Sequence, residues 1–153
     1  MNFTEHHPQF FTATILEWKH LLRNNQYKEI ILDSLRFLVK EKRAVVNSFV
    51  IMSNHIHLIW QAINRFTSQQ NQQSFLKYTA QQIKFDLQKS NPQLLEEFRV
   101  HATDRMYQFW ERNSLSIDLY SEEVYLQKGN YLHYNPVEAG LCKFPQDYYY
   151  SSA

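Results

Sequence analysis

Two histidines separated by a single residue are the first feature of this sequence that suggests chemistry. They lie in IMSNHIHLIW, residues 51–60, a run that is otherwise typical of a buried strand. Side chains alternate between the two faces of a strand, so His55 and His57 share one face while Ile56 and Leu58 point to the other. Two neighbouring imidazoles are half of a metal site.

A phenol and an amide form a second pair near the C-terminus. In GNYLHYNPVEAG, residues 129–140, Tyr131 and Asn135 are four positions apart, which places them one turn apart on the same face of a helix. Two imidazoles and one amide oxygen would leave open positions on a divalent cation, which suits Mg²⁺ or Mn²⁺ engaging a substrate phosphate. Tyr131 is then the candidate nucleophile.

The first part of the chain predicts alternating strands and helices. Residues 10–18, 44–52 and 55–62 are rich in β-forming residues and predict strands, and the two-residue connection Ser53-Asn54 is typical of a hairpin between the last two. Apolar residues at helical spacing predict a helix over 27–43. The histidine pair therefore stands at the start of a strand.

The second part of the chain begins with a polar stretch, 64–74, which predicts a loop. An amphipathic helix is predicted over 74–90, a strand over 107–112, and a last helix from about Ser121 to Asn135-Pro136, where the proline disfavours helical continuation. The order β-α-β-β-α-β-α predicts one α+β domain over residues 1–153. We expect a ferredoxin-like antiparallel sheet with helices packed on one face, and a catalytic C-terminal helix.

Composition narrows the class of protein. A single cysteine, Cys142, excludes an internal disulfide framework and the usual multi-thiolate zinc clusters. The formal net charge of +1 means that any binding of nucleic acid must depend on local clusters of Lys and Arg. No apolar run approaches the length of a membrane span and the N-terminus lacks a signal-peptide pattern, so we expect a cytoplasmic protein.

Three strings of this sequence, MSNHIHLIW, FWERN and YLHYNPVEAGLCKFPQDYYYSSA, resemble the HUH single-tyrosine transposases, in particular the REP-associated tyrosine transposase group. The resemblance implies that His55 and His57 bind a metal, that Tyr131 attacks DNA and that Asn135 completes the metal shell. It implies cleavage and rejoining of single-stranded or hairpin DNA through a 5′-phosphotyrosine, by a protein that acts as a monomer or a homodimer, with the monomer favoured.

Two positions depart from the family pattern. Ser53 stands where related sequences have proline, which should change the rigidity of the turn more than the chemistry. Gly129 lies inside the predicted catalytic helix, where glycine costs about 1 kcal/mol relative to alanine. Our hypothesis is that Gly129 loosens this helix so that Tyr131 moves between attacking and product geometries.

Basic and aromatic side chains outside the histidine pair are candidates for contacts with DNA. Lysines on the polar face of the 74–90 helix can position phosphates, although a solvated charged face explains them equally well. The predicted DNA contacts are Lys77, Lys84, Arg105, Trp110 and Arg112.

Two other classes of function remain open. A non-catalytic module could bind single-stranded nucleic acid by stacking bases on exposed aromatic rings. A metal-dependent phosphodiester hydrolase would use water as the nucleophile and leave Tyr131 without a role.

Overall fold

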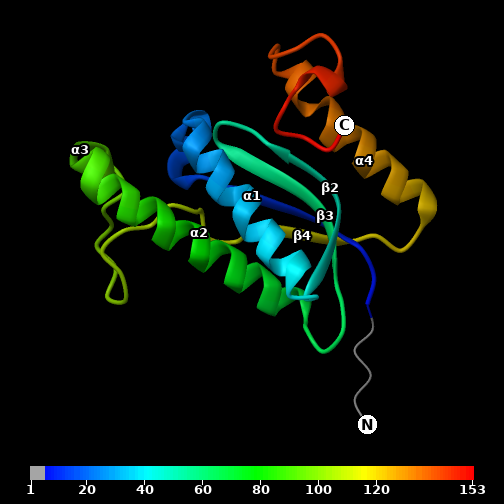
Figure 1. Ribbon diagram of the computed structural model, residues 1–153, viewed down its shortest axis with the longest axis horizontal. Coiled ribbons are helices and arrows are strands. Elements are labelled where there is room, and N and C mark those ends of the chain that lie inside the picture. The colour runs from blue at the N-terminus through cyan, green and yellow to red at the C-terminus, as the bar shows by residue number, and fades with distance from the viewer. Residues whose placement is uncertain (1–5) are drawn as a thin grey trace.

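The structure is a computed structural model that describes residues 6–153 (Figure 1). Its strands are β1 (Gln9–Thr14), β2 (Ala44–Ile51), β3 (His55–Ala62) and β4 (Leu115–Asp118). Its α-helices are α1 (Asn25–Lys40), α2 (Ser68–Ser90), α3 (Pro92–Glu96) and α4 (Glu122–Glu138). The four strands form one sheet in the order β2-β3-β1-β4, and each neighbouring pair is antiparallel. The predicted α+β class is confirmed.

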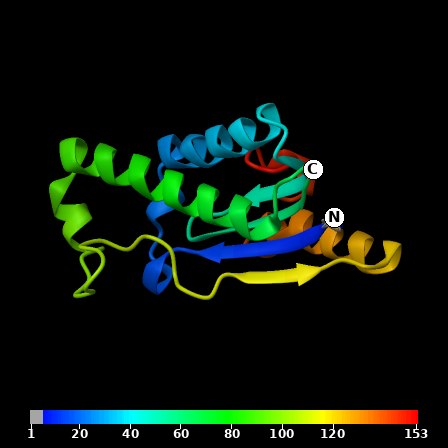
Figure 2. The same ribbon diagram turned by 90° about the horizontal axis from the view of Figure 1, so that it is seen from below.

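The sheet has a core on each face. On one face, β1 and β3 contribute alternate side chains that pack with the apolar sides of α1 and α2, including Phe11, Leu58, Leu35 and Phe75. Figure 2 shows these two helices lying beside each other on that side of the sheet. On the opposite face, Phe10, Val50 and Ile59 pack with Leu132 of α4.

The placement of α4 corrects the expectation that the helices share one face. Figure 1 shows α1 and α2 on one side of the sheet and α4 on the other. The reason is the alternation of β3, since Ile56 and Leu58 face the first core while Ile59 faces the second. Both faces of the strand carry buried side chains, and both are covered.

The helix that follows β3 begins earlier than the sequence suggested. Thr67 caps α2 by accepting a hydrogen bond from the Gln70 backbone N–H, and the Gln70 side chain accepts from the Thr67 N–H. This capping box satisfies two backbone donors that a helix start leaves free. The prediction of a loop over 64–74 is therefore wrong from Ser68 onward.

The predicted strand over 107–112 is also wrong. That segment contributes only isolated bridges, Arg99 to Tyr107 and Ile15 to Trp110, and the fourth strand is β4 instead. The first strand is shorter than 10–18, because a 3-10 turn at Leu16–Trp18 follows it. The last helix continues past Asn135 to Glu138, with Pro136 inside it.

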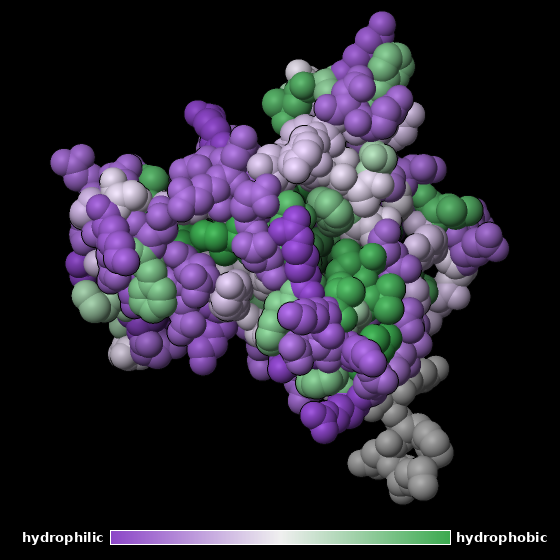
Figure 3. All heavy atoms as spheres, viewed as in Figure 1, coloured by the Kyte–Doolittle hydropathy of each residue, from purple (hydrophilic) through white to green (hydrophobic). Residues whose placement is uncertain are grey.

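The surface is mainly polar over α2 and α3, and apolar side chains gather beside α1 and over β2 (Figure 3). There, Leu32, Val39, Val46 and Phe49 line a groove between the helix and the sheet edge. Among the described residues, no helix has an apolar stretch long enough to cross a lipid bilayer.

Candidate functional site

The two histidines lie on the sheet face that α4 covers. Their ring centroids are 4.8 Å apart. The register of β1 against β3 places Thr12 opposite His57, and the Thr12 hydroxyl lies 2.8 Å from His57 Nδ1. His55 Nδ1 lies 2.7 Å from the side-chain oxygen of Asn54. Each ring is therefore held at Nδ1, as the rings of metal-binding histidines usually are.

α4 brings the phenol and the amide to this histidine pair. Asn135 Oδ1 lies 3.0 Å from His55 Nε2, although the two residues are 80 positions apart in the chain. The ring of Tyr131 lies edge-on to His57 with the centroids 5.5 Å apart, and Phe10 stacks on His57 at 5.2 Å. The structure thus unites all four residues that the sequence singled out.

Burial sets the charge state of the imidazoles. His57 is 5% exposed, and desolvation, together with the charges of His55 and Lys128, lowers its pKa to about 3. Desolvation also lowers the pKa of His55, against an opposing effect of its contact with Asn135. Both rings are therefore neutral at pH 7 and have a lone pair available for a cation. Tyr131, by contrast, is 54% exposed and open to a substrate.

Two imidazole nitrogens and one amide oxygen form a donor set that can hold a divalent cation. With the Asn135 amide oriented as in the structure, His55 faces an amide oxygen at both ring nitrogens, yet a neutral imidazole donates from only one. Neighbouring ligands of an octahedral ion with bonds of about 2.1 Å are about 3.0 Å apart, which is the separation of His55 Nε2 and Asn135 Oδ1. Residues 6–153 contain no cluster of three or more His, Cys, Asp or Glu suited to a metal, and the group that joins the two imidazoles at this place is the amide of Asn135.

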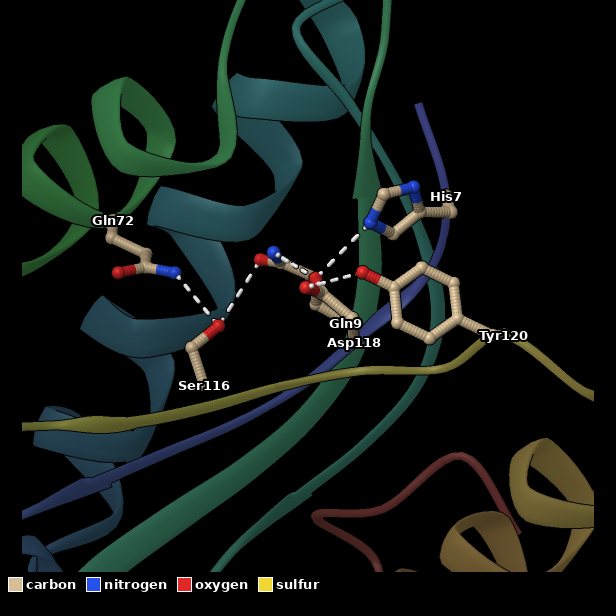
Figure 4. Close-up of polar contacts among 6 residues, drawn as sticks. All are labelled: His7, Gln9, Gln72, Ser116, Asp118 and Tyr120. Atoms are coloured by element: carbon tan, nitrogen blue, oxygen red, sulfur yellow. Dashed lines mark hydrogen bonds and ion pairs between the residues drawn. The ribbon is translucent and has the colours of Figure 1, made fainter. Parts of the chain in front are cut away.

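α4 is fixed at its start by its cap and by the segment that leads into it. The Ser121 hydroxyl accepts from the Val124 N–H, and Tyr120 donates to Asp118 at 3.0 Å. Gln9 of β1 donates to the same carboxylate at 2.7 Å and His7 lies 3.2 Å from it, so this network ties the connection to the sheet (Figure 4).

The end of α4 is fixed as well. Gly140, at φ 76°, donates to the Val137 carbonyl, and Leu141 donates to the Pro136 carbonyl. This pattern closes the helix and requires a left-handed residue that glycine adopts without strain. Because both ends of α4 are held, the positions of Tyr131 and Asn135 relative to the sheet are fixed.

The predicted DNA contacts gather elsewhere. All five line a cleft of about 870 Å³ between α2 and the 104–114 segment. α2 covers the opposite face of the sheet from the histidines, so the structure does not bring these residues to the histidine pair. The predicted DNA contacts in this cleft are Lys77, Lys84, Arg105, Trp110 and Arg112.

Two of these five side chains have partners within the protein. Trp110 is 7% exposed and donates its indole N–H to Thr79 at 3.0 Å, so it is a core residue without a free face for a base. Arg105 forms an ion pair with Asp104 at 2.9 Å on the protein surface. Lys77, Lys84 and Arg112 have no ion pair within the described chain.

Three further residues belong to the site but were not found from the sequence. Thr12 contacts His57 only because of strand register, which local patterns do not reveal. Asn54 precedes His55 directly, and Lys128 lies one helical turn before Tyr131, so both could have been found by spacing. The Lys128 ammonium lies over the rings of Phe10 and Tyr131, 5.2 and 5.7 Å from their centroids.

Comparison with known proteins shows which solved structures share this fold. No family model and no curated protein matches this sequence. A solved structure of a REP-associated tyrosine transposase bound to a REP hairpin superposes with a TM-score of 0.71 at 16% identity, covering 99% of this chain and 79% of that one. A "putative transposase" from Deinococcus radiodurans R1 superposes with a TM-score of 0.55 at 12% identity, covering 86% and 92%. The resemblance to REP-associated tyrosine transposases is thus confirmed at the level of the fold.

Proposed function

We propose that this protein cleaves and rejoins single-stranded or hairpin DNA with Tyr131 as the nucleophile, in the manner of the HUH single-tyrosine transposases. The observation that carries the proposal is the meeting of two neutral imidazoles, an amide oxygen and a half-exposed phenol at one place. A tyrosine that only packs in the core would be buried, whereas Tyr131 is half exposed. An ordinary surface tyrosine would not contact a buried histidine pair, whereas Tyr131 does.

In this proposal His55, His57 and Asn135 hold Mg²⁺ or Mn²⁺. When bound, the cation polarises the scissile phosphate and stabilises charge on its oxygens. Thr12 and Asn54 keep the two rings in place through their Nδ1 atoms. The Lys128 ammonium lies over the Tyr131 ring, 5.7 Å from its centroid, and so places a positive charge beside the nucleophile.

The chemical step is an in-line displacement at phosphorus. The phenol proton of Tyr131 passes to solvent, and the phenolate oxygen uses its electron pair to form a bond to phosphorus. The P–O3′ bond breaks, and the leaving oxygen takes up a proton as a 3′-hydroxyl. The product is a 5′-phosphotyrosine, which keeps the energy of the phosphodiester for the reverse attack by a 3′-hydroxyl, so no nucleotide cofactor is required.

Further parts of the proposal concern the substrate and the assembly. The superposed REP-associated transposase is bound to a REP hairpin, which supports hairpin DNA as the substrate class here. We assign phosphate contacts in the α2 cleft to Lys77, Lys84, Arg105 and Arg112, and none to Trp110. A monomer suffices, because one chain supplies all four residues at the site. The strand order β2-β3-β1-β4 supports the ferredoxin-like assignment.

A covalent-trapping assay tests this function. The protein is incubated with Mn²⁺ and a labelled pool of hairpin oligonucleotides with randomised single-stranded flanks, and adducts that resist denaturation are counted. We expect an adduct that Tyr131→Phe abolishes. Tyr134→Phe is the matched control, because Tyr134 is on the same helix and 51% exposed but lies outside the histidine site.

The other outcomes point to the rival functions. Cleavage without an adduct, unaffected by Tyr131→Phe, would indicate a metal-dependent hydrolase. Binding without cleavage in the presence of Mn²⁺ would indicate a non-catalytic binding module. An adduct that persists in Tyr131→Phe would show that Tyr131 is not the attacking residue.

A further inference from the structure

A cavity of about 800 Å³ lies next to the histidine site, at the hairpin end of the sheet. The β2–β3 hairpin, the start of α1 and the end of α4 enclose it. His55 and Asn135 line the cavity, whereas His57 and Tyr131 do not. Its charged wall consists of Arg23 and Lys28, and the carboxylate of Glu138 faces it from α4.

Lys28 is a buried cation without an anion. The residue is 7% exposed, and within the described part of the chain its ammonium contacts the Arg23 carbonyl at 3.4 Å, the Asn25 side-chain oxygen at 3.2 Å and the Tyr150 ring at 5.2 Å. Burial lowers the pKa of Lys28. Within residues 6–153, neither Lys28 nor Arg23 forms an ion pair. A buried charge is costly unless it is paired, so these contacts point to an anion supplied by a ligand.

The geometry of the proposed reaction indicates which part of the DNA would supply this anion. Along β3 and α4, His57 meets Tyr131, His55 meets Asn135 one turn later, and the cavity lies beyond. In an in-line displacement the entering and leaving oxygens are on opposite sides of phosphorus. If Tyr131 enters from one end of the histidine pair, the leaving 3′-oxygen is at the other end, and its strand continues into the cavity.

We propose that the cavity holds the end of the leaving strand, and that Lys28 and Arg23 bind the backbone phosphate nearest its 3′-hydroxyl. This inference rests on the proposed function, since it assigns the two DNA ends to the two sides of the site. The leaving strand is then retained between cleavage and rejoining, with its 3′-hydroxyl close to the phosphotyrosine.

Salt dependence of binding tests the cavity without any chemistry. In a Tyr131→Phe background, the affinity for a short single strand ending in a 3′-hydroxyl is measured over a range of salt. Each lost phosphate contact lowers the slope of log K against log salt by about 0.7 for a single strand, so the Arg23→Gln Lys28→Met double variant, which loses both contacts to this one phosphate, should lower it by about 0.7. Arg23→Gln alone, at an exposed side chain, should lower it by less than the double variant does, because Lys28 still faces the same phosphate.

Arg36→Gln is the matched control, because Arg36 is an exposed arginine of α1 that pairs with Asp33 and lies outside the cavity. It should leave the slope unchanged. A double variant whose slope equals that of the control would overturn the proposal.

A second measurement follows the strand after cleavage. With a 5′ label the leaving strand is observed directly, and the double variant should release it about tenfold faster or more while still forming the adduct, as expected for loss of charged hydrogen bonds. Unchanged release and unchanged rejoining would also overturn the proposal. If the unmodified protein forms no adduct at all, the proposed function fails, and the salt dependence alone decides whether the cavity binds a strand end.

Discussion

Acidification is expected to destabilise this protein, and the buried imidazole of His57 is a main cause. Burial holds the pKa of this imidazole at about 3 in the folded chain, whereas an exposed histidine in the unfolded chain has a pKa of about 6.5. Between these two values the unfolded state binds more protons at His57 than the folded state does. The free energy of unfolding therefore decreases as the pH falls through this window.

The size of the effect follows from the two pKa values. Integrating the difference in bound protons from about pH 7.5 to about pH 5 gives a loss of about 2 kcal/mol, and the full loss below about pH 3 is about 5 kcal/mol. The contribution of the neutral His57 imidazole to the free energy of unfolding is fully present above about pH 6.5. A loss of about 2 kcal/mol is a large part of the stability of a typical domain.

Urea unfolding at the two pH values, without added metal, measures this loss. His57→Gln removes the titrating group while keeping a polar side chain opposite Thr12, so this variant should lose about 2 kcal/mol less than the unmodified protein between about pH 7.5 and about pH 5. His101→Gln, at an exposed histidine, should lose as much as the unmodified protein does. If the unmodified protein and His57→Gln lost equal stability, the claim that burial keeps His57 neutral would be refuted.

Three further predictions concern the helix, the site and the core. A methyl group added at Gly129 would lie 3.9 Å from Ile59 Cδ1, so Gly129→Ala should raise the free energy of unfolding by up to about 1 kcal/mol, measured in urea. Unchanged rates of cleavage and rejoining in that variant would eliminate the hinge hypothesis. Mn²⁺ at about 100 times its Kd should stabilise the protein by about 2.7 kcal/mol in thermal unfolding, and Asn135→Ala, but not the control His133→Gln, should weaken this effect. Thr79→Val leaves the buried indole N–H of Trp110 without its acceptor and should cost about 1–3 kcal/mol, whereas an unchanged melting temperature would contradict the core role of that hydrogen bond.

Errors in the predicted elements have physical causes. Tyr107, Phe109 and Trp110 resemble a strand because they are aromatic, but their segment bonds to the turn before it, with Gln108 donating to the Phe98 carbonyl. Their rings fill the core under α2 instead of forming a pleated surface. The early start of α2, by contrast, was readable, since Thr67 and Gln70 have the spacing of a capping box.

The predicted DNA contacts also show which properties local sequence patterns predict and which depend on neighbours in space. Lys77 and Lys84 belong to one polar helix face, which spacing alone predicts. Whether Trp110 is free to stack on a base depends on its neighbours in space, and Thr79 occupies its indole N–H. The sequence did not single out Arg23 and Lys28, because no local pattern shows that Lys28 is buried without an anion.

The sequence by itself determined that His55 and His57 share a face and that Tyr131 and Asn135 are one turn apart, because these relations follow from the periods of a strand and a helix. Only the tertiary structure decided that the two pairs meet. Each face of the strand carries an apolar residue at its middle, Leu58 on one and Ile59 on the other, so local patterns did not specify which face α4 would cover. Its packing on Ile59, opposite α1 and α2, selected the face that carries the histidines.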